Sequence, residues 1–475
     1  MLTEEKNNVQ EIVKTMMEKA RKARLEIENY TQEQIDDVCR AIGWEVFCDE
    51  NITTLANMAV EETGMGIVED KIAKHRNKVL GVLCDVLDPA AKTVGLVEVD
   101  REKGIYKYAK PVGTVVALTP VTNPTATPSN AAISILKGRN SVIFCPHPKA
   151  KKCTAKAIAF MREGLRKVNA PEDLIQVTEE PSMELTQAMM KEADLLLAVG
   201  GGPMVRAAYS SGTPAYGVGP GNSVTMLAED CDIEDAVSKI YTSKTFDNAT
   251  ACSSENSMLV HKSIYDRVIS AFEKRGCYLC TDEEKEKLKK WMWVPNKKGE
   301  IGLNPKIVGK SAEDIAANAG VSIPAGCRII LVKGNVPVEK EQFAHEKLSP
   351  ILTVWEYDDF KRGVQLMAEI TDNCGRGHSC GIHTFNDAYA DYLGLHMNSS
   401  RILVRQAQAS GNGGSFVNGM PSTVAVGCGT WGHTSTTENI HYKHFIQKTW
   451  LSYPIADYTP SVEEIWGDFF KRYAK

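Results

Sequence analysis

Apolar segments alternate with amphipathic helical patterns between residues 106 and 209. An extended stretch at 106–113 comes first, and strands are predicted at 114–120, 141–146, 174–178 and 194–199. Helices are predicted at 129–136, 149–167 and 183–192, with one more between the glycines at 200–202 and Tyr209. Strands joined by helices of this length pair in parallel through right-handed crossovers. The pattern therefore predicts an α/β fold with a doubly wound parallel sheet, whose ligands lie at the carboxyl ends of the strands.

Composition excludes several classes of protein. The chain has 475 residues, enough for two or three domains, and carries a formal net charge of −5 without a basic block, so no nucleic-acid partner is expected. It has no apolar run of membrane-spanning length, and its acidic start lacks a signal core, which predicts a cytoplasmic protein that binds no membrane. Thirteen irregularly spaced cysteines favour a reducing compartment. The pair Cys277 and Cys280 has no second pair beside it, so no metal site is predicted.

Cys252 lies in the segment FDNATACSSEN, a candidate for a nucleophile. A buried structural cysteine is the alternative, because free cysteines are often buried. The upstream segment AYGVGPGN, residues 215–222, contains no carboxylate. Release of an acyl group by water generally needs a general base. The resemblance described below implies that the missing carboxylate at this place makes a second thiol the acceptor.

Two loops at predicted strand ends suggest a dinucleotide. Gly200, Gly201 and Gly202 stand where a strand becomes a helix, where backbone N–H groups favour a phosphate. The spacing is not GxGxxG, and glycines that only turn the chain are equally compatible. The loop FCPHPKA, residues 144–150, leaves another strand end and brings His147 and Lys149 with it.

Long motifs in a consistent order carry a family resemblance. They are YAKPVGTVVALTPVTNPTATP, ILKGRNSVIFCPHPKAKK, VGGGPMVRAAYSSGTPAYGVGPGN, the Cys252 segment, EKLSPILTV, GRGHSCGIHT and GGSFVNGMPSTVAVGCGTWGHTSTTENIHYKHF. The chain resembles the aldehyde dehydrogenase superfamily, and within it the coenzyme-A-acylating branch that includes the sulfoacetaldehyde and succinate-semialdehyde enzymes.

The resemblance implies an aldehyde-dehydrogenase-like fold with a Rossmann-like cofactor domain, an α/β catalytic domain and an oligomerisation arm. The expected N-terminal helices and dinucleotide-binding domain span residues 1–225, with part of 430–445 returning to them. The catalytic domain is expected at 226–429, and the arm at 98–113 and 446–475. A homodimer or homotetramer is the expected assembly.

The resemblance also implies roles for single residues. Cys252 matches the family nucleophile, and Asn123 matches the amide that stabilises the oxyanion, although a turn residue before proline is the simpler interpretation of Asn123. NAD or NADP would be bound by Thr119, Pro120, Pro146, His147, Lys149, Gly200, Gly201, Val205, Gly219 and Glu346. With no acidic group beside His147, NADP stays possible. Coenzyme A is the expected cosubstrate.

The substrate is expected to be an anionic aldehyde such as sulfoacetaldehyde, with succinate semialdehyde or a short neutral aldehyde (acetaldehyde or propanal) as alternatives. Arg405 could grip the anion with its guanidinium fork, and His378 and His433 could also face the substrate. A hydrolytic dehydrogenase and a shell-associated scaffold remain less favoured alternatives. In the scaffold alternative the N-terminal helix would be a tag for a microcompartment.

Overall fold

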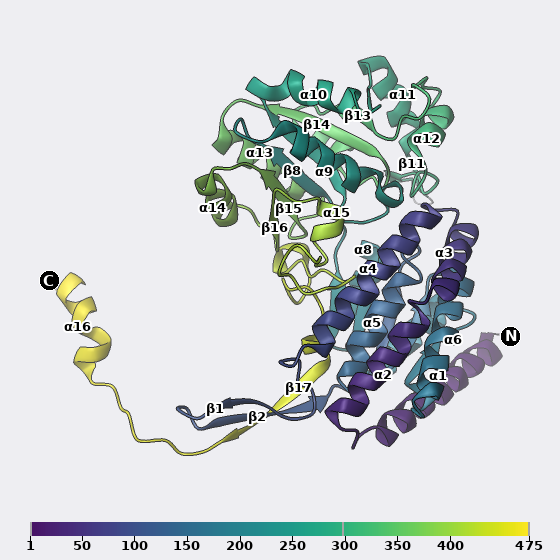
Figure 1. Ribbon diagram of the computed structural model, residues 1–475, viewed down its shortest axis with the longest axis vertical. Helices are drawn as coiled ribbons and strands as arrows, with labels where there is room; N and C mark the ends of the chain where they lie inside the picture. Colours follow the sequence, from purple (N-terminus) through teal and green to yellow (C-terminus); the bar gives the residue numbers. More distant parts are fainter. Residues whose placement is uncertain (1, 297–298, 474–475) are drawn as a thin grey trace.

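Three β-sheets organise the protein into two lobes and a projecting arm (Figure 1). The computed structural model describes residues 2–296 and 299–473. One lobe contains a five-stranded sheet and the N-terminal helices, the other a seven-stranded sheet, and the arm a three-stranded sheet. The α/β architecture with parallel sheets predicted from the sequence is therefore confirmed.

The five-stranded sheet is entirely parallel, in the order β5-β4-β3-β6-β7. Its strands are β3 Thr114–Thr119, β4 Ser141–Pro146, β5 Ile175–Val177, β6 Leu195–Val199 and β7 Ala215–Val218. The intervening helices are α5 Ala126–Lys137, α6 Lys151–Lys167, α7 Met183–Glu192 and α8 Gly202–Tyr209. Every residue of β3, β4 and β6 is buried, as expected for strands covered on both faces. Helix α5 begins three residues before the predicted 129, because Pro128 is tolerated in a first turn.

The seven-stranded sheet of the other lobe is also parallel, in the order β10-β13-β14-β9-β8-β15-β16. The strands are β8 Ser223–Leu227, β9 Glu255–His261, β10 Tyr278–Leu279, β13 Ile330–Lys333, β14 Ile351–Tyr357, β15 Cys380–His383 and β16 Ile402–Val404. The helices are α9 Ile233–Thr245, α10 Tyr265–Glu273, α11 Asp282–Met292, α12 Ala312–Ala319, α13 Phe360–Asn373, α14 Asp387–His396 and α15 Gln408–Gly411. A small ribbon, β11 Trp293–Pro295 with β12 Ile301–Leu303, lies at its edge.

Four helices precede the first strand: α1 Leu2–Glu26, α2 Gln32–Glu45, α3 Asp49–Thr63 and α4 Val68–Leu87. Helix α1 packs on α7, and its residues Val13, Met17, Ala20 and Ala23 are buried. The apolar face of α1 is therefore used inside this chain, which gives no support to the less favoured alternative of a free encapsulation tag. None of the described helices is long and apolar enough to cross a membrane.

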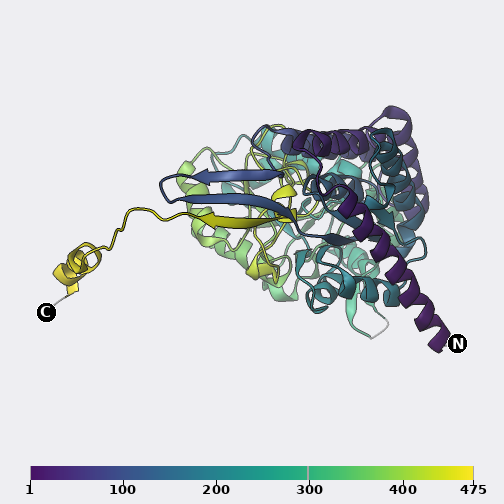
Figure 2. The ribbon, with the colours of Figure 1, turned by 90° about the horizontal axis from the view of Figure 1, so that it is seen from below.

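The arm is an antiparallel sheet of β1 Gly95–Asp100, β2 Ile105–Pro111 and β17 Ile446–Ser452. Its first strand begins three residues before the predicted 98. Beyond β17 the chain leaves the body in an extended segment that ends in α16 Val462–Tyr473 (Figure 2). Apolar side chains on α16 are exposed: Val462, Ile465, Trp466, Phe469, Phe470 and Tyr473.

All thirteen cysteines are free thiols. Cys277 and Cys280 are buried in the hydrophobic cores beneath β10. Burial among apolar side chains accounts for both residues without a metal.

Asn140 joins the arm to the first lobe. Its Oδ1 accepts the backbone N–H groups of Val112 (2.7 Å) and Gly113 (3.0 Å), just after β2. Its Nδ2 donates to the carbonyls of Ile135 (2.9 Å) and Phe445 (2.7 Å). One buried amide thus links α5, the end of β2 and the segment that enters β17.

Asn140→Ala should lower the free energy of unfolding by about 2–4 kcal/mol, since it removes four hydrogen bonds around buried backbone groups. Urea denaturation measures the change. Asn57→Ala, which removes one bond on the exposed face of α3, is the matched control and should shift stability by about 0.5 kcal/mol or less. Equal effects of the two substitutions would contradict the linking role of Asn140.

Candidate active site

Cys252 lies in a tight loop between α9 and β9, at the junction of the two lobes. The three residues Asp247, Asn248 and Ala249 all have positive φ, at 51°, 50° and 57°. Gly221 packs directly against the loop, because a Cβ there would lie 2.0 Å from the Cys252 carbonyl oxygen. The segment without a carboxylate, 215–222, thus touches the candidate nucleophile, and position 221 has no room for a side chain.

The buried carboxylate of Asp247 holds this loop to α4. Lys71 Nζ lies 3.1 Å and Lys74 Nζ 2.5 Å from Asp247 Oδ2, which also accepts the Thr250 hydroxyl at 2.7 Å. Asp247 Oδ1 accepts the Ile67 N–H at 2.9 Å. Burial opposes ionisation, but Lys74 and Lys71 hold the pKa of Asp247 below its ordinary value.

His378 lies against the Cys252 thiol. Its Nε2 is 3.3 Å from Sγ, and its Nδ1 is 2.8 Å from the Ser379 hydroxyl. Burial, with the Arg401 guanidinium nearby, lowers the pKa of His378 to about 3. Burial, followed by the negative charge of Glu346, raises the pKa of Cys252 to about 12. The pair therefore rests as a thiol and a neutral imidazole, so His378 orients the thiol rather than ionising it.

Two cavities meet at Cys252. One has a volume of about 570 Å³, the other of about 540 Å³, and Cys252, Asn123 and Val424 line both. A reacting carbon at Sγ can therefore be reached from two directions.

The cavity of about 540 Å³ lies at the carboxyl ends of β3, β4 and β6. It collects nearly all the residues predicted to bind a dinucleotide: Thr119, Pro120, Pro146, His147, Lys149, Gly200, Gly201, Gly219 and Glu346. Val205 is the exception, because it is buried in the apolar core and packs against Gly217. Backbone N–H groups at the start of α8 and the basic Lys149 suit a phosphate.

Glu346 is the carboxyl group of this cavity. Burial raises the pKa of Glu346 to about 8, against the effect of a hydrogen bond from the Gly221 N–H. Near neutral pH the group is therefore mostly protonated, so it can donate to a ribose hydroxyl but is a poor proton acceptor.

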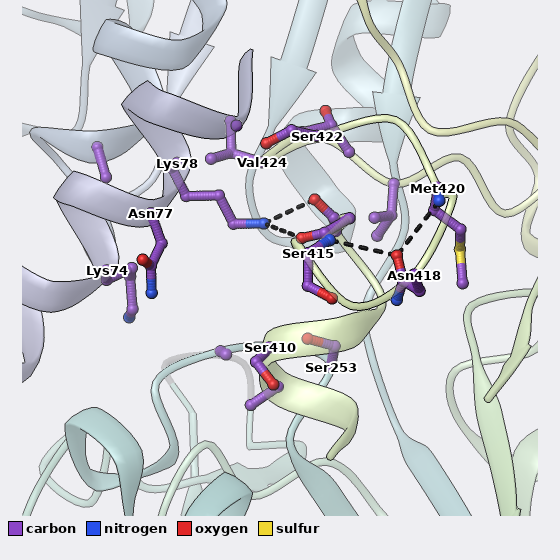
Figure 3. Close-up of a pocket in the computed structure, with 18 of the residues that line it drawn as sticks. Lys74, Asn77, Lys78, Ser253, Ser410, Ser415, Asn418, Met420, Ser422 and Val424 are labelled. Atoms are coloured by element: carbon purple, nitrogen blue, oxygen red, sulfur yellow. Dashed lines mark hydrogen bonds between the residues drawn. The ribbon is translucent and has the colours of Figure 1, made fainter. Parts of the chain in front are cut away.

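The cavity of about 570 Å³ lies between α4, α9 and the loop that follows α15 (Figure 3). Its polar side chains come mainly from α4 and from serines of the other lobe: Lys74, Asn77, Lys78, Ser253, Ser410 and Ser415. Lys74 Nζ donates to Asn123 Oδ1 at 2.8 Å. A lysine can only donate, so this contact assigns the amide oxygen to Lys74 and leaves the Asn123 nitrogen facing the cavity.

The other predicted substrate residues lie elsewhere. Arg405 donates to the Thr384 carbonyl at 2.6 Å and stacks over the Phe385 ring at 5.0 Å. His433 is exposed after a short helical turn at residues 430–432. Neither side chain lines a cavity that contains Cys252. The geometry of this chain therefore gives no support to Arg405 or His433 as substrate ligands, and of the three predicted residues only His378 lies beside the reacting thiol.

Within residues 2–296 and 299–473, one group of side chains has the spacing of a metal site. Glu438, His441 and His444 offer ligand atoms within 4.8 Å of one another. These residues line neither of the two cavities at Cys252, and His444 already forms an ion pair with Glu438 at 3.4 Å. The group therefore has no place in the chemistry of the thiol.

Sequence reasoning missed the lysines of α4. Lys71, Lys74 and Lys78 are spaced i, i+3 and i+7, so they share one helix face. This spacing is the feature of the sequence from which the three lysines could have been predicted to act together. A charged stripe on a helix ordinarily faces solvent, which hides such residues in an amphipathic pattern.

A family model described as the aldehyde dehydrogenase family matches residues 2–287. A sulfoacetaldehyde dehydrogenase from Acholeplasma sp is 58% identical over 96% of this chain and 93% of its own length. A sulfoacetaldehyde dehydrogenase (acylating) from Bilophila wadsworthia is 56% identical over 98% of this chain and 99% of its own. A succinate-semialdehyde dehydrogenase (acetylating) from Clostridium kluyveri is 42% identical over 96% and 99% of the two chains.

Solved structures agree with these relatives. An acetylating aldehyde dehydrogenase from Geobacillus thermoglucosidasius matches with a TM-score of 0.91 at 34% identity, over 96% of this chain and 99% of that one. A propionaldehyde dehydrogenase from Rhodopseudomonas palustris with bound propionyl-CoA matches with a TM-score of 0.82 at 27% identity, over 93% and 94%. An engineered glycolyl-CoA reductase with bound NADP+ matches with a TM-score of 0.81 at 27% identity, over 93% and 96%.

Alkylation of Cys252 by iodoacetamide, without any ligand, should accelerate about tenfold per pH unit from pH 7 to pH 9 with no plateau. The reason is that a thiol with a pKa of about 12 gains thiolate in proportion to hydroxide throughout this range. Mass spectrometry of the peptide that contains Cys252 gives the rate, with exposed Cys84 as an internal reference for the reagent. A plateau below pH 8 would show that His378 stabilises a thiolate.

Proposed function

Because this chain belongs to the aldehyde dehydrogenase family, in the branch that transfers the acyl group to coenzyme A, we propose that it oxidises sulfoacetaldehyde reversibly to sulfoacetyl-CoA. The observation that carries the proposal is the thiol of Cys252 at the meeting point of two cavities, one of them lined by lysines and serines. The two sulfoacetaldehyde relatives support this substrate. Succinate semialdehyde is the second candidate, since it shares the anionic end.

In the proposed mechanism Cys252 Sγ attacks the aldehyde carbonyl carbon as its S–H proton passes to water, and the carbonyl oxygen becomes the oxyanion of a thiohemiacetal. The Asn123 amide nitrogen and the Cys252 backbone N–H donate to the oxyanion, a contribution of about 10²–10³ in rate for one such donor. Bound NAD or NADP supplies a hydride acceptor, with a positively charged ring in its oxidised form. Loss of hydride from the thiohemiacetal leaves a thioester on Cys252.

The dinucleotide is proposed to lie along the cavity of about 540 Å³. Gly200, Gly201 and the start of α8 would contact the pyrophosphate, and Glu346 the nicotinamide ribose. His147 and Lys149 would lie near the adenine ribose, where both are exposed. From Pro146 to Lys149 the cavity wall carries no carboxylate to repel a 2′-phosphate, so either NAD or NADP fits.

The acyl group leaves to the coenzyme A thiol, because the loop at 215–222 provides no base for water. One thioester replaces another of similar energy, so the reaction runs in both directions. We further propose that the protein is cytoplasmic and that the arm joins copies of the chain into a homodimer or homotetramer. The arm at β1, β2 and β17 projects from the body, which suits that role (Figure 2).

Turnover should depend on coenzyme A. In a spectrophotometric assay of NADH or NADPH with sulfoacetaldehyde at pH 7, its omission should give at most one reduced cofactor per active site and then a stall. Cys252→Ala should abolish both burst and turnover while cofactor binding, followed by fluorescence, persists. Steady acid formation without coenzyme A that rises through pH 8 would contradict the proposal, because it would make Glu346 a base for water.

Lys74 is proposed to position the Asn123 amide. Lys74→Met should lower kcat by about 10- to 100-fold with little change in KM, because the amide loses its fixed orientation. In an Asn123→Ala background the same substitution should have almost no further effect on kcat, since nothing is left to orient. Additive losses in the double variant would show that Lys74 acts only through stability of the Asp247 cluster, which thermal unfolding of each variant measures independently.

A further inference from the structure

The cavity of about 570 Å³ contains two lysines in different electrostatic states. The charge of Lys74 is shared with Asp247, to which it lies 2.5 Å away. Lys78, one helical turn further along α4, forms no ion pair with any of the described residues within 4.0 Å. Its ammonium group is therefore a positive charge of the cavity wall that no ion pair compensates.

The hydrogen bonds of Lys78 leave it incompletely satisfied. Nζ donates to the carbonyls of Gly413 at 2.7 Å and Gly414 at 3.4 Å, in the loop shown in Figure 3. An ammonium group has three donors, so one remains for a ligand. The Cys252 thiol lines the same cavity and is near enough to influence the charge of Lys78.

The wall of this cavity also carries an acidic side chain, which does not form an ion pair with Lys78. Asp85 also lines the wall, but its Oδ2 accepts the Ser422 N–H at 2.5 Å. Burial raises the pKa of Asp85 above its ordinary value. The negative charge of Asp85 favours the charged form of Lys78, but no ion pair joins the two groups. Burial, with the charge of Lys74 nearby, lowers the pKa of Lys78 to about 8, as expected for a cation that lacks a counter-ion.

Neutral donors surround the same space. Asn77 precedes Lys78 on α4, and the hydroxyls of Ser253, Ser410 and Ser415 line the opposite walls (Figure 3). Sulfonate and carboxylate oxygens accept hydrogen bonds from such groups, and bonds to a charged acceptor are the stronger ones. A small anion inside this cavity would thus find one cation and several donors.

We propose that Lys78 binds the anionic end of the aldehyde, a sulfonate or a carboxylate, while Cys252 attacks its carbonyl carbon. This inference rests on the proposed function, and it makes Lys78 the residue that selects charged over neutral aldehydes. Two effects favour charged aldehydes over neutral ones. A bound anion gains a counter-ion, whereas a bound neutral aldehyde leaves the ammonium group of Lys78 unpaired.

The test compares kcat/KM for sulfoacetaldehyde, succinate semialdehyde and propanal in wild type, Lys78→Met and Arg76→Met. Lys78→Met should lose about 10- to 150-fold on the better anionic substrate and less than about threefold on propanal, the range expected for one hydrogen bond to a charged group. Arg76→Met removes a charge from the outer face of α4, where Arg76 pairs with Asp49, and should leave all three values within about twofold.

An equal loss on charged and neutral aldehydes would overturn the inference, because Lys78 would then only support the loop at Gly413 and Gly414. If the wild-type kcat/KM is higher for propanal than for both anionic aldehydes, the proposed substrate is wrong, whatever the effect of Lys78→Met. Ethanesulfonate has the sulfonate group but no carbonyl. Its inhibition of propanal oxidation therefore tests anion binding without turnover of an anionic aldehyde. Ethanesulfonate should compete with propanal in wild type and at least tenfold more weakly in Lys78→Gln, and equal inhibition of both would also overturn the inference.

Discussion

The carboxylate of Asp247, which has no exposed surface, determines how the two lobes of this enzyme meet. It binds two lysines of α4, one threonine hydroxyl and one backbone N–H. A buried charge is costly unless its partners surround it closely. Because the two lysines and the Ile67 N–H belong to an N-terminal helix and its cap, whereas Asp247 and Thr250 belong to the loop of the other lobe, the Cys252 loop has its position only when both lobes are folded and in contact.

Two neighbouring lysines of one helix therefore differ in their electrostatic surroundings. Lys74 forms an ion pair with Asp247 and donates hydrogen bonds to Asn123 and Thr250. Lys78 is beyond reach of that carboxylate and retains its charge for the cavity. The residue type is the same, and the difference comes from a single turn of helix relative to one buried anion.

The cavity proposed for the dinucleotide could be predicted from the sequence because it is built from strand ends. Thr119 and Pro146 are the last residues of β3 and β4, Gly200 follows β6, and parallel pairing brings strand ends to one edge. Val205 lies in the core and not in this cavity, because the pattern does not say which side of α8 faces the core. The substrate side depends on packing between distant segments, such as Lys74 with Asp247, 173 residues apart. Arg405 was predicted to bind the substrate anion because of its guanidinium group. The chain at the end of β16 directs this side chain to the Thr384 carbonyl instead.

The three left-handed residues before Cys252 affect how the enzyme responds to heat. Non-glycine residues in this conformation cost roughly 1 kcal/mol or more each and persist only while their surroundings hold them. Asp247 is held by α4, which lies in the other lobe, whereas Asn248 donates to the Gly309 carbonyl at 3.1 Å. Loosening of α4 would release the loop while both parallel sheets are still intact. Inactivation would then precede melting, and a heated sample could retain its circular dichroism after its activity had gone.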